Sequence, residues 1–348
     1  MKKGVLVCIG KGEHKNIGDY IQSIAAKQFA GADAVMLERE MLHKYDGGPT
    51  RLIMNAWFMH HPKRFPPSSD IIPLFVSFHV RPTIESSFFT ERTVAYLKAH
   101  EPIGCRSTDA VEMLHRHGIA AEYTACVTLT LGETYRHVAV DAPPVFVDPF
   151  FRRFGRRWWL SSAPLKILSR LPYVVRHFRA IRILAEKFRV YEYWFGNRFA
   201  AVRWYNAAEF HRAYTPAFAE EVLLSADYVT HKVLKREFPT EESLFAHAHE
   251  LLMRYERVPF VVTSRLHCSL PCIAMGTPVW VPFHPDMTTG RFGGNDDFMN
   301  KLPFAADGRL ETPPGGRIQP KQLPPVRTEH LQYAEELKRR CREFMEAE

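Results

Sequence analysis

The stretch 261–278, VVTSRLHCSLPCIAMGTP, combines a buried strand with the start of a helix. Its apolar β-branched opening is typical of a buried strand, and Gly276 followed by Pro278 is a stop signal for a helix. Arg265 and His267 fall where that helix would begin. In a parallel α/β sheet, ligands bind where a strand ends and the next helix starts. The sequence therefore predicts a ligand site at this turn.

The residues of this turn suit an anionic substrate and a proton transfer. Free backbone N–H groups at a helix start favour an anion, and the guanidinium of Arg265 matches a carboxylate or a phosphate. His267 can move a proton, because the ordinary pKa of histidine is about 6.5. Ser264 adds a hydroxyl that can cap the helix or contact substrate. The alternative is that Arg265 forms a surface ion pair and that His267 only satisfies a helix end.

Length and composition indicate a folded protein of two domains. A chain of 348 residues fits two domains better than one, and 46% hydrophobic residues is ordinary for a globular protein. No window approaches the roughly 20 apolar residues of a membrane span, and the apolar run at 4–9 is too short for a signal peptide. The six cysteines include no C-x-x-C pair, which fits neither a disulfide framework nor a zinc site and indicates a reducing cytoplasm.

Strands and helices alternate along the chain. In the first part we expect strands at 4–9, 33–38, 51–55, 72–80, 103–107 and 122–131, and helices ending near 29, 99 and 117. This alternation indicates an α/β domain with a doubly wound parallel sheet, which we place at 1–140. A second domain is expected at 141–310, with strands at 145–148, 226–231, 260–262 and 279–283 and a capped helix at 240–254. Residues 311–348 then form a Pro-rich linker and an amphipathic helix that packs across the domains.

The first domain supplies further candidates at strand ends. Asn16 and Asp19 flank Gly18, which permits tight backbone approach before a helix; Asp19 could equally favour the helix dipole. His79 lies at the carboxyl end of the predicted strand 72–80, on the ligand side of a parallel sheet, although a hydrogen-bonded core histidine is the alternative. Arg106 ends the next short strand.

The second domain adds two candidate substrate contacts. His231 ends the strand at 226–231, and Arg291 belongs to a polar, Gly-containing loop expected on the same side as Arg265. The adjacent pair His60 and His61 has no acidic or cysteine partner at ligand spacing, so a loop pair is favoured and no metal site is expected.

Three blocks together resemble the polysaccharide pyruvyl transferase family. They are N-I-G-D at 16–19, then I-G-C-R at 103–106 followed by a helix and C-V-T-L-T-L, and finally V-T-S-R-L-H-C-S-L-P-C-I-A-M-G-T-P at 262–278. Each block alone is weak, but their order and spacing match over about residues 4–135 and 225–300. Residues 150–215 carry no resemblance.

The resemblance implies two Rossmann-like domains arranged as in B-type glycosyltransferases (the GT-B fold), with the active site between them. It implies transfer of a pyruvyl group from phosphoenolpyruvate, a co-substrate, to two hydroxyls of a sugar in a cell-surface polysaccharide, with release of phosphate. The family's catalytic arginine and histidine match Arg265 and His267. A further aspartate, histidine and arginine of the family match Asp19, His79 and Arg106 more loosely.

The residues allow this chemistry. Phosphoenolpyruvate carries a carboxylate and a phosphate, and Arg265 and Arg106 are the candidate cationic anchors. His267 is the candidate acid that protonates the methylene carbon, and Asp19 or His79 could act as base for the sugar hydroxyls. No step requires a metal or another cofactor.

The excess positive charge is concentrated in one aromatic segment. The chain carries a net charge of +8, while residues 152–214 alone carry 14 Lys or Arg against 3 Asp or Glu. The insertion 150–218 could be a partly helical segment packed on the second domain. It could also be a membrane-surface patch on the inner face of the cell membrane, which would suit a lipid-linked acceptor. Nucleic-acid binding is disfavoured, because no nucleic-acid fold signature accompanies the Arg and aromatic residues.

Two other functions compete with a pyruvyl transferase. The first is a GT-B glycosyltransferase that uses a nucleotide sugar, although the sequence has no nucleotide-sugar signature. The second is a membrane- or polyanion-binding protein in which the R-L-H block is only structural. Binding of phosphoenolpyruvate that is lost in Arg265→Ala separates an enzyme of this kind from a binding protein.

Overall fold

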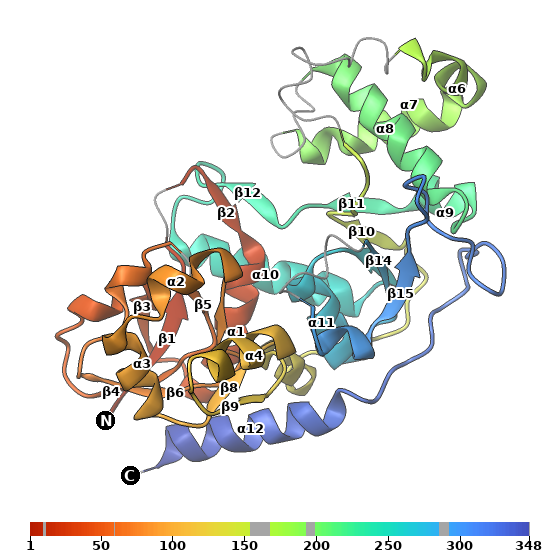
Figure 1. Cartoon of the computed structure of the whole chain (residues 1–348). Helices are drawn as coiled ribbons and strands as arrows, with labels where there is room; N and C mark the ends of the chain where they lie inside the picture. Colours follow the sequence, from red (N-terminus) through yellow and green to blue (C-terminus); the bar gives the residue numbers. More distant parts are fainter. Residues whose placement is uncertain (10–11, 59, 154–167, 193–198, 285–291, 348) are drawn as a thin grey trace.

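The two largest sheets of the molecule are both parallel (Figure 1). They belong to a computed structural model that describes residues 1–9, 12–58, 60–153, 168–192, 199–284 and 292–347. The N-terminal sheet is built from β1 (Lys2–Val7), β3 (Val35–Glu38), β4 (Thr50–Ile53) and β6 (Ile71–Leu74). Its spatial order is β3-β1-β4-β6, so the chain reverses direction across the sheet between β1 and β4. The strands predicted at 4–9, 33–38 and 51–55 are confirmed.

Helices cover both faces of the N-terminal sheet. Successive side chains of a strand point to opposite faces. Val5 of β1 packs with Leu337 of α12 (Leu331–Glu346), whereas its neighbour Leu6 shares a core with Met113 of α4 (Thr108–Arg116). Burial on both faces explains why the strand sequence is a continuous apolar run without polar alternation. The predicted C-terminal amphipathic helix is confirmed as α12, which lies along the N-terminal half (Figure 1).

Three elements predicted in this half are divided or replaced. The strand expected at 72–80 is split into β6 and β7 (His79–Val80), because Ser77 between them adopts a left-handed φ of 56°. The helix expected at 85–99 is split into α2 (Glu85–Phe88) and α3 (Glu91–Lys98).

The strand expected at 122–131 is wrong beyond its first residues. β9 (Ala121–Tyr123) pairs with β8 (Ile103–Cys105), and residues 127–133 form the 3-10 helix η4 (Val127–Glu133) after Ala125 at φ 58°. Every residue from Val127 to Leu131 is buried, and periodicity alone cannot distinguish a buried strand from a buried helical turn.

The C-terminal sheet has the strand order of a doubly wound fold. It contains β10 (Val145–Val147), β11 (Asp227–Val229), β13 (Val261–Thr263), β14 (Val279–Phe283) and β15 (Asn300–Pro303). The spatial order β11-β10-β13-β14-β15 is 2-1-3-4-5 in chain order, with every pair parallel. This order places a topological switch point between β10 and β13, the position where doubly wound sheets bind ligands. The structure thus has the predicted α/β class, with parallel sheets in both halves.

The two halves share a strand pair and a continuous apolar core. β2 (His14–Asn16) pairs antiparallel with β12 (Lys232–Leu234) from the other half (Figure 1). Residues of α1 (Ile17–Ala30), η4, α10 (Glu241–Glu256) and α11 (Leu266–Met275) belong to one hydrophobic cluster. A Cβ on Gly132 of η4 would lie 2.0 Å from the carbonyl oxygen of Ala274, so this close approach to α11 requires glycine.

The described part of the insertion 150–218 is helical and packs on the C-terminal sheet. It includes α6 (Leu171–Arg176), α7 (Phe178–Lys187) and α8 (Ala200–Tyr214). Ile181, Phe210 and Tyr214 share a core with Phe146 of β10, which anchors the helices to one face of the sheet. No helix within the described ranges is long and apolar enough to cross a membrane.

Candidate functional site

The turn between β13 and α11 has the predicted strand–turn–helix form. Arg265 occupies the N-cap position with extended backbone, and α11 ends at Gly276 in the left-handed conformation. The hydroxyl of Thr263 accepts a hydrogen bond from the Arg265 N–H at 3.0 Å and donates to the Val147 carbonyl at 2.9 Å. These bonds hold Arg265 at the switch point, beside the end of β10. Its side chain keeps 20% exposure.

Asp148, which the sequence analysis did not select, orients Arg265. It follows β10 directly and is 6% exposed. Its Oδ2 accepts from Nε of Arg265 at 2.9 Å and from the His231 N–H at 2.9 Å, while Oδ1 has no hydrogen-bond partner. The sequence signal that was missed is an acidic residue at the end of the predicted strand 145–148, which is the neighbour of β13. A buried carboxylate on Nε fixes the direction of the whole guanidinium plane.

Further cations surround this carboxylate. Burial and the nearby Arg265 lower the pKa of Arg153 to about 10, and Asp148 acts against that shift. Burial and Arg265 also lower the pKa of Lys232. The pairing of β12 with β2 places Lys232 opposite Asn16. Arg265, Arg153 and Lys232 are thus the cations that lie near the Asp148 carboxylate at the switch point.

His267 meets Arg106 from the other half of the molecule. His267 is the second residue of α11, has non-helical backbone angles (φ −83°, ψ 23°) and is 7% exposed. Its Nε2 lies 3.4 Å from Nη1 of Arg106, which is 1% exposed. Burial lowers the pKa of Arg106, and its Nε has no hydrogen-bond partner. The side-chain amide of Asn295 donates a hydrogen bond to the backbone carbonyl of Arg106 at 2.8 Å.

The start of α1 completes the junction of the two halves, which is where Arg106 meets His267. Asn16 is the N-cap and accepts from the Gly18 N–H at 3.3 Å. A Cβ on Gly18 would lie 3.2 Å from Cβ of His267, so helix α1 lies directly against this histidine. Asp19 lies in the first turn, is half-buried, and interacts electrostatically with Arg106. Its carboxylate also favours the helix dipole, the structural alternative considered above.

The remaining predicted residues are placed differently. His79 is 1% exposed, and its Nδ1 lies 3.4 Å from the hydroxyl of Ser107, the neighbour of Arg106. The Ser264 hydroxyl accepts from the Phe150 N–H and donates to the Pro282 carbonyl, which ties the ends of three segments together.

The imidazole of His231 points away from Arg265 and into the core. Its Nε2 bonds the hydroxyl of buried Tyr255 at 2.8 Å, while the His231 backbone bonds Asp148 and Ile17. Its prediction as a substrate contact gains no support from this position. Arg291 lies outside the described residues.

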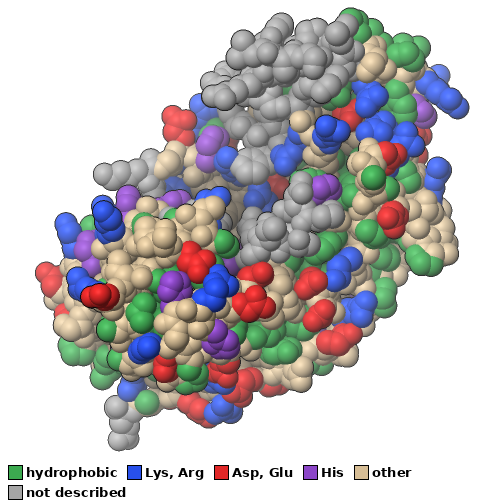
Figure 2. All heavy atoms as spheres, in the orientation of Figure 1, with side chains coloured by type: hydrophobic (Ala, Val, Ile, Leu, Met, Phe, Trp, Pro, Cys, Tyr) green, Lys and Arg blue, Asp and Glu red, His purple; other side chains and the backbone are tan. Residues whose placement is uncertain are grey.

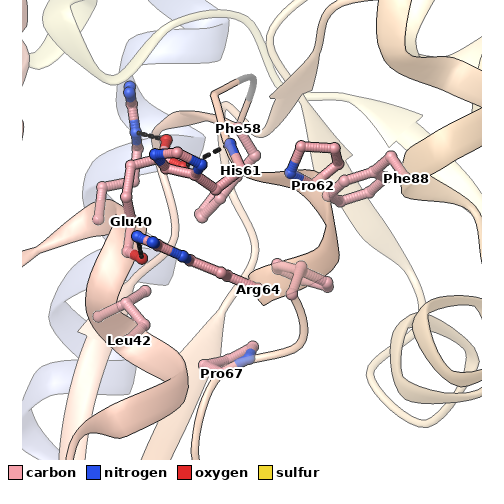
Figure 3. A pocket seen from close by; sticks show the side chains of 10 residues that line it. Glu40, Leu42, Phe58, His61, Pro62, Arg64, Pro67 and Phe88 are labelled. Carbon is pink, nitrogen blue, oxygen red and sulfur yellow. Dashed lines mark hydrogen bonds and ion pairs between the residues drawn. The ribbon is translucent and has the colours of Figure 1, made fainter.

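Two further groups of histidines are the loop pair His60 and His61 and the cluster of His177, His211 and Glu220. The His61 N–H donates to Glu40, which lines a recess with Arg64 and aromatic side chains (Figure 3). Among the residues that the structure describes, the one group with ligand atoms close enough for a metal is His177, His211 and Glu220. His211 already bonds Tyr173 through Nδ1 at 2.8 Å and Glu220 through Nε2 at 2.7 Å.

A model of the family described as polysaccharide pyruvyl transferase matches residues 65–281, more than half of the chain. The match contains His79, Arg106, Arg265 and His267, whereas Asn16 and Asp19 precede it. It also runs through the insertion, which the resemblance had not covered. No curated protein matches.

The matched range contains both residues that meet across the halves, Arg106 and His267, and it also contains Arg265 at the switch point. A guanidinium next to an imidazole is an arrangement that can hold an anion beside a group able to move a proton. The chain belongs to the polysaccharide pyruvyl transferase family and is an enzyme, a transferase that acts on polysaccharide.

Proposed function

We propose that the protein transfers the enolpyruvyl group of phosphoenolpyruvate to two hydroxyls of one sugar in a cell-surface polysaccharide or its lipid-linked precursor. The product is a pyruvate ketal, and phosphate is released. The observation that carries the proposal is the meeting of Arg106 and His267 at the start of α11, beside the Arg265–Asp148 pair. In this proposal, cations from both halves of the chain hold a small substrate that carries a carboxylate and a phosphate.

Arg265 and Arg106 are the proposed anchors for the donor. Asp148 accepts a hydrogen bond from Nε of Arg265. The far edge of the guanidinium is therefore directed away from this carboxylate. Arg106 is fully buried beside His267, and an anion there would relieve the cost of its burial. The N-terminus of α11 adds backbone N–H groups on the same side.

His267 is the proposed proton carrier. A guanidinium can only donate, so Nε2 of His267 accepts from Arg106 and its ring is neutral without substrate. We infer that the bound donor anion offsets the guanidinium charge and that His267 then takes up the proton it delivers to the methylene carbon. The central carbon becomes electrophilic, a sugar hydroxyl adds to it, phosphate leaves with the C–O bonding electrons, and a second hydroxyl closes the ketal. One hydroxyl proton balances that on the new methyl group, and the other leaves with phosphate.

Asp19 is the better supported candidate base for the sugar hydroxyls. Its carboxylate is half-buried in the first turn of α1, next to Gly18, which packs against His267. His79, the other candidate, is almost fully buried and bonds Ser107. The strand orders of both sheets begin 2-1-3-4, which supports two doubly wound units. Their arrangement as in the GT-B fold, with limits near 140 and 310, is part of the proposal.

The exposed face of α6 and α7 supports a peripheral contact with an anionic membrane from the cytoplasmic side. Leu171 and Val175 lie four positions apart on α6, Phe178 begins α7, and the three side chains are 48%, 73% and 50% exposed. Exposed arginines flank them: Arg176, Arg179 and Arg182. Figure 2 shows Lys and Arg side chains beside hydrophobic ones over these helices. Such a face suits an acceptor sugar carried on a lipid.

The decisive experiment measures which small molecule is released. The enzyme is incubated with phosphoenolpyruvate and a lipid-linked oligosaccharide pool, and in parallel with nucleotide sugars and the same pool. We expect phosphate release and a gain of the pyruvyl mass on the glycan in the first reaction. Release of a nucleotide in the second, without phosphate release in the first, would assign the protein to the glycosyltransferases. Loss of phosphoenolpyruvate binding in Arg265→Ala would place the donor at the switch point.

A further inference from the structure

A short segment of the C-terminal half, 292–295, lies on the turn that carries Arg106 in the N-terminal half. The segment follows β14 and leads into the 3-10 helix η8 (Asn295–Phe298), while the turn connects β8 to α4. The Gly293 carbonyl accepts a hydrogen bond from the Thr108 N–H at 3.2 Å, and the Asn295 amide donates to the Arg106 carbonyl at 2.8 Å. The segment therefore bonds the turn at two points, one on each side of position 107.

Two adjacent glycines permit this close contact. A Cβ on Gly293 would lie 2.7 Å from Oγ1 of Thr108, closer than a real Cβ comes to another heavy atom. Gly294 has a left-handed φ of 80°, and a Cβ there would lie 2.8 Å from Cζ of Tyr123. The sequence G-G-N at 293–295 therefore fits closely against the turn of the other half.

Among the residues that the structure describes, the side chain of Asn295 hydrogen-bonds only Arg106. Asn295 is 0% exposed, its Nδ2 donates to the Arg106 carbonyl, and its Oδ1 has no hydrogen-bond partner. An unpaired buried oxygen is unfavourable for stability, and an apolar side chain of the same shape would avoid that cost. Stability alone therefore does not account for an asparagine at this position.

The bond matters because Arg106 reaches across the junction of the two halves. Its backbone N–H donates to the Phe78 carbonyl at 3.0 Å in the N-terminal half, whereas its carbonyl is bonded from the C-terminal half. Its Nη1 lies 3.4 Å from Nε2 of His267, which is long for a hydrogen bond, and its Nε has no partner. The position of the guanidinium therefore depends on how firmly the Arg106 backbone is held.

We propose that Asn295 is a positioning residue for the donor site. By holding the Arg106 carbonyl from the C-terminal half, it places the guanidinium relative to Arg265 and His267, which belong to that half. The inference rests on the proposed function, in which Arg106 and Arg265 anchor phosphoenolpyruvate. A misplacement of about 1 Å can cost an enzyme up to about a hundredfold in activity, so a bond to the backbone of an anchor is enough to matter.

The test uses Asn295→Leu, which keeps the branched shape and removes the amide donor. Asn300→Leu is the matched control, because Asn300 is 7% exposed and its amide likewise donates to backbone carbonyls, those of Val279 and Pro325. Phosphoenolpyruvate binding is measured by calorimetry, together with the melting temperature of each variant. We expect the Kd to rise about tenfold or more in Asn295→Leu and to stay close to the wild-type value in Asn300→Leu.

A double-mutant cycle distinguishes a positioning role from a purely structural one. Arg106→Lys keeps a charge at the anchor but lacks the guanidinium that Asn295 positions. If Asn295 acts through Arg106, Asn295→Leu should raise the Kd much less in the Arg106→Lys background than in the wild type. An equal rise in both backgrounds, an equal rise in Asn300→Leu, or an unchanged Kd in Asn295→Leu would each overturn the proposal.

Gly294→Ala tests the same contact should Asn295→Leu fail to fold. Its methyl would press on Tyr123 and lift the segment 292–295 from the turn, so the same rise in Kd is expected. Gly308→Ala is the control, because Gly308 has a similar φ of 77° and no atom within 4 Å of its Cβ. A wild type that does not bind phosphoenolpyruvate rejects the proposed function and this inference with it. A wild type that binds it no better than Gly294→Ala and Asn295→Leu rejects only the role of Asn295.

Discussion

Arg106 Nη1 and His267 Nε2 lie 3.4 Å apart, although 161 positions separate the two residues in the sequence. The contact joins the two halves of the molecule and fixes the imidazole as a hydrogen-bond acceptor. It follows that the proposed donor site cannot form in either half alone. It also follows that substrate binding should change the protonation of this pair.

Donor binding is expected to take up a proton. If the phosphoenolpyruvate anion lets His267 become charged, the observed binding enthalpy will vary with the ionisation enthalpy of the buffer. Calorimetry in phosphate-free buffers of different ionisation enthalpy measures this dependence, and His267→Gln should abolish most of it.

Turnover of His267→Ala should fall by about two orders of magnitude or more. Near-normal turnover in that variant, with an intact circular dichroism spectrum, would remove His267 from the mechanism.

Asp148→Asn should weaken donor binding while leaving the backbone intact. Asp148 has φ 42°, a conformation that asparagine tolerates as well as aspartate. The amide cannot pair with the Arg265 guanidinium as a charge, so the arginine loses its orientation. We expect at least a tenfold rise in the Kd for phosphoenolpyruvate and a destabilisation of about 1–3 kcal/mol. An unchanged Kd would mean that Arg265 does not need this carboxylate.

Gly18→Ala should impair catalysis more than stability. The added methyl would lie 3.2 Å from Cβ of His267, so the histidine must move by a few tenths of an ångström. A displacement of a catalytic group is expected to lower kcat several-fold. Gly12→Ala is the control, because the nearest atom to its Cβ would be 3.8 Å away. Equal kcat values for both variants would contradict the proposed contact role of Gly18.

Acid should destabilise the helical segment through His211. Burial lowers the pKa of His211, while Glu220 acts against the shift. Below the unfolded pKa of about 6.5, the unfolded chain binds a proton that the folded chain refuses, so stability falls as the pH falls from neutrality through the lower folded pKa. We therefore expect the melting temperature to drop between pH 7.5 and 5.5, and to drop less in His211→Gln. His43 and His330 also have pKa values lowered by burial, so part of the drop should persist in that variant.

Val175→Glu should reduce binding to anionic vesicles. Val175 is 73% exposed on the face of α6, and a carboxylate there opposes both the apolar contact and the charge attraction. Val326→Glu is the matched control, since Val326 is 67% exposed in the linker before α12. Flotation with vesicles that contain phosphatidylserine measures the difference. No flotation of the wild type at low salt would end the membrane proposal, and equal loss in both variants would point to bulk charge alone.

The turn between β13 and α11 could be derived from the sequence because its signals are local. A β-branched run, an arginine at a helix start and a glycine before a proline each act within a few residues, and β13, α11 and the cap at Gly276 follow them. Elements that depend on distant packing were predicted less well. The apolar run at 126–131 is a 3-10 helix because it packs against α11, and no local pattern encodes that partner.

The sequence by itself therefore determined the α/β class, the family, and the residue types of the proposed donor site. Only the tertiary structure decided how the residues are placed: that Arg106 reaches His267, that Asp148 holds Arg265, and that His231 points into the core. The physical reason is that strand and helix signals act over a few residues. The position of a side chain at a sheet edge is set instead by the order in which distant strands pair.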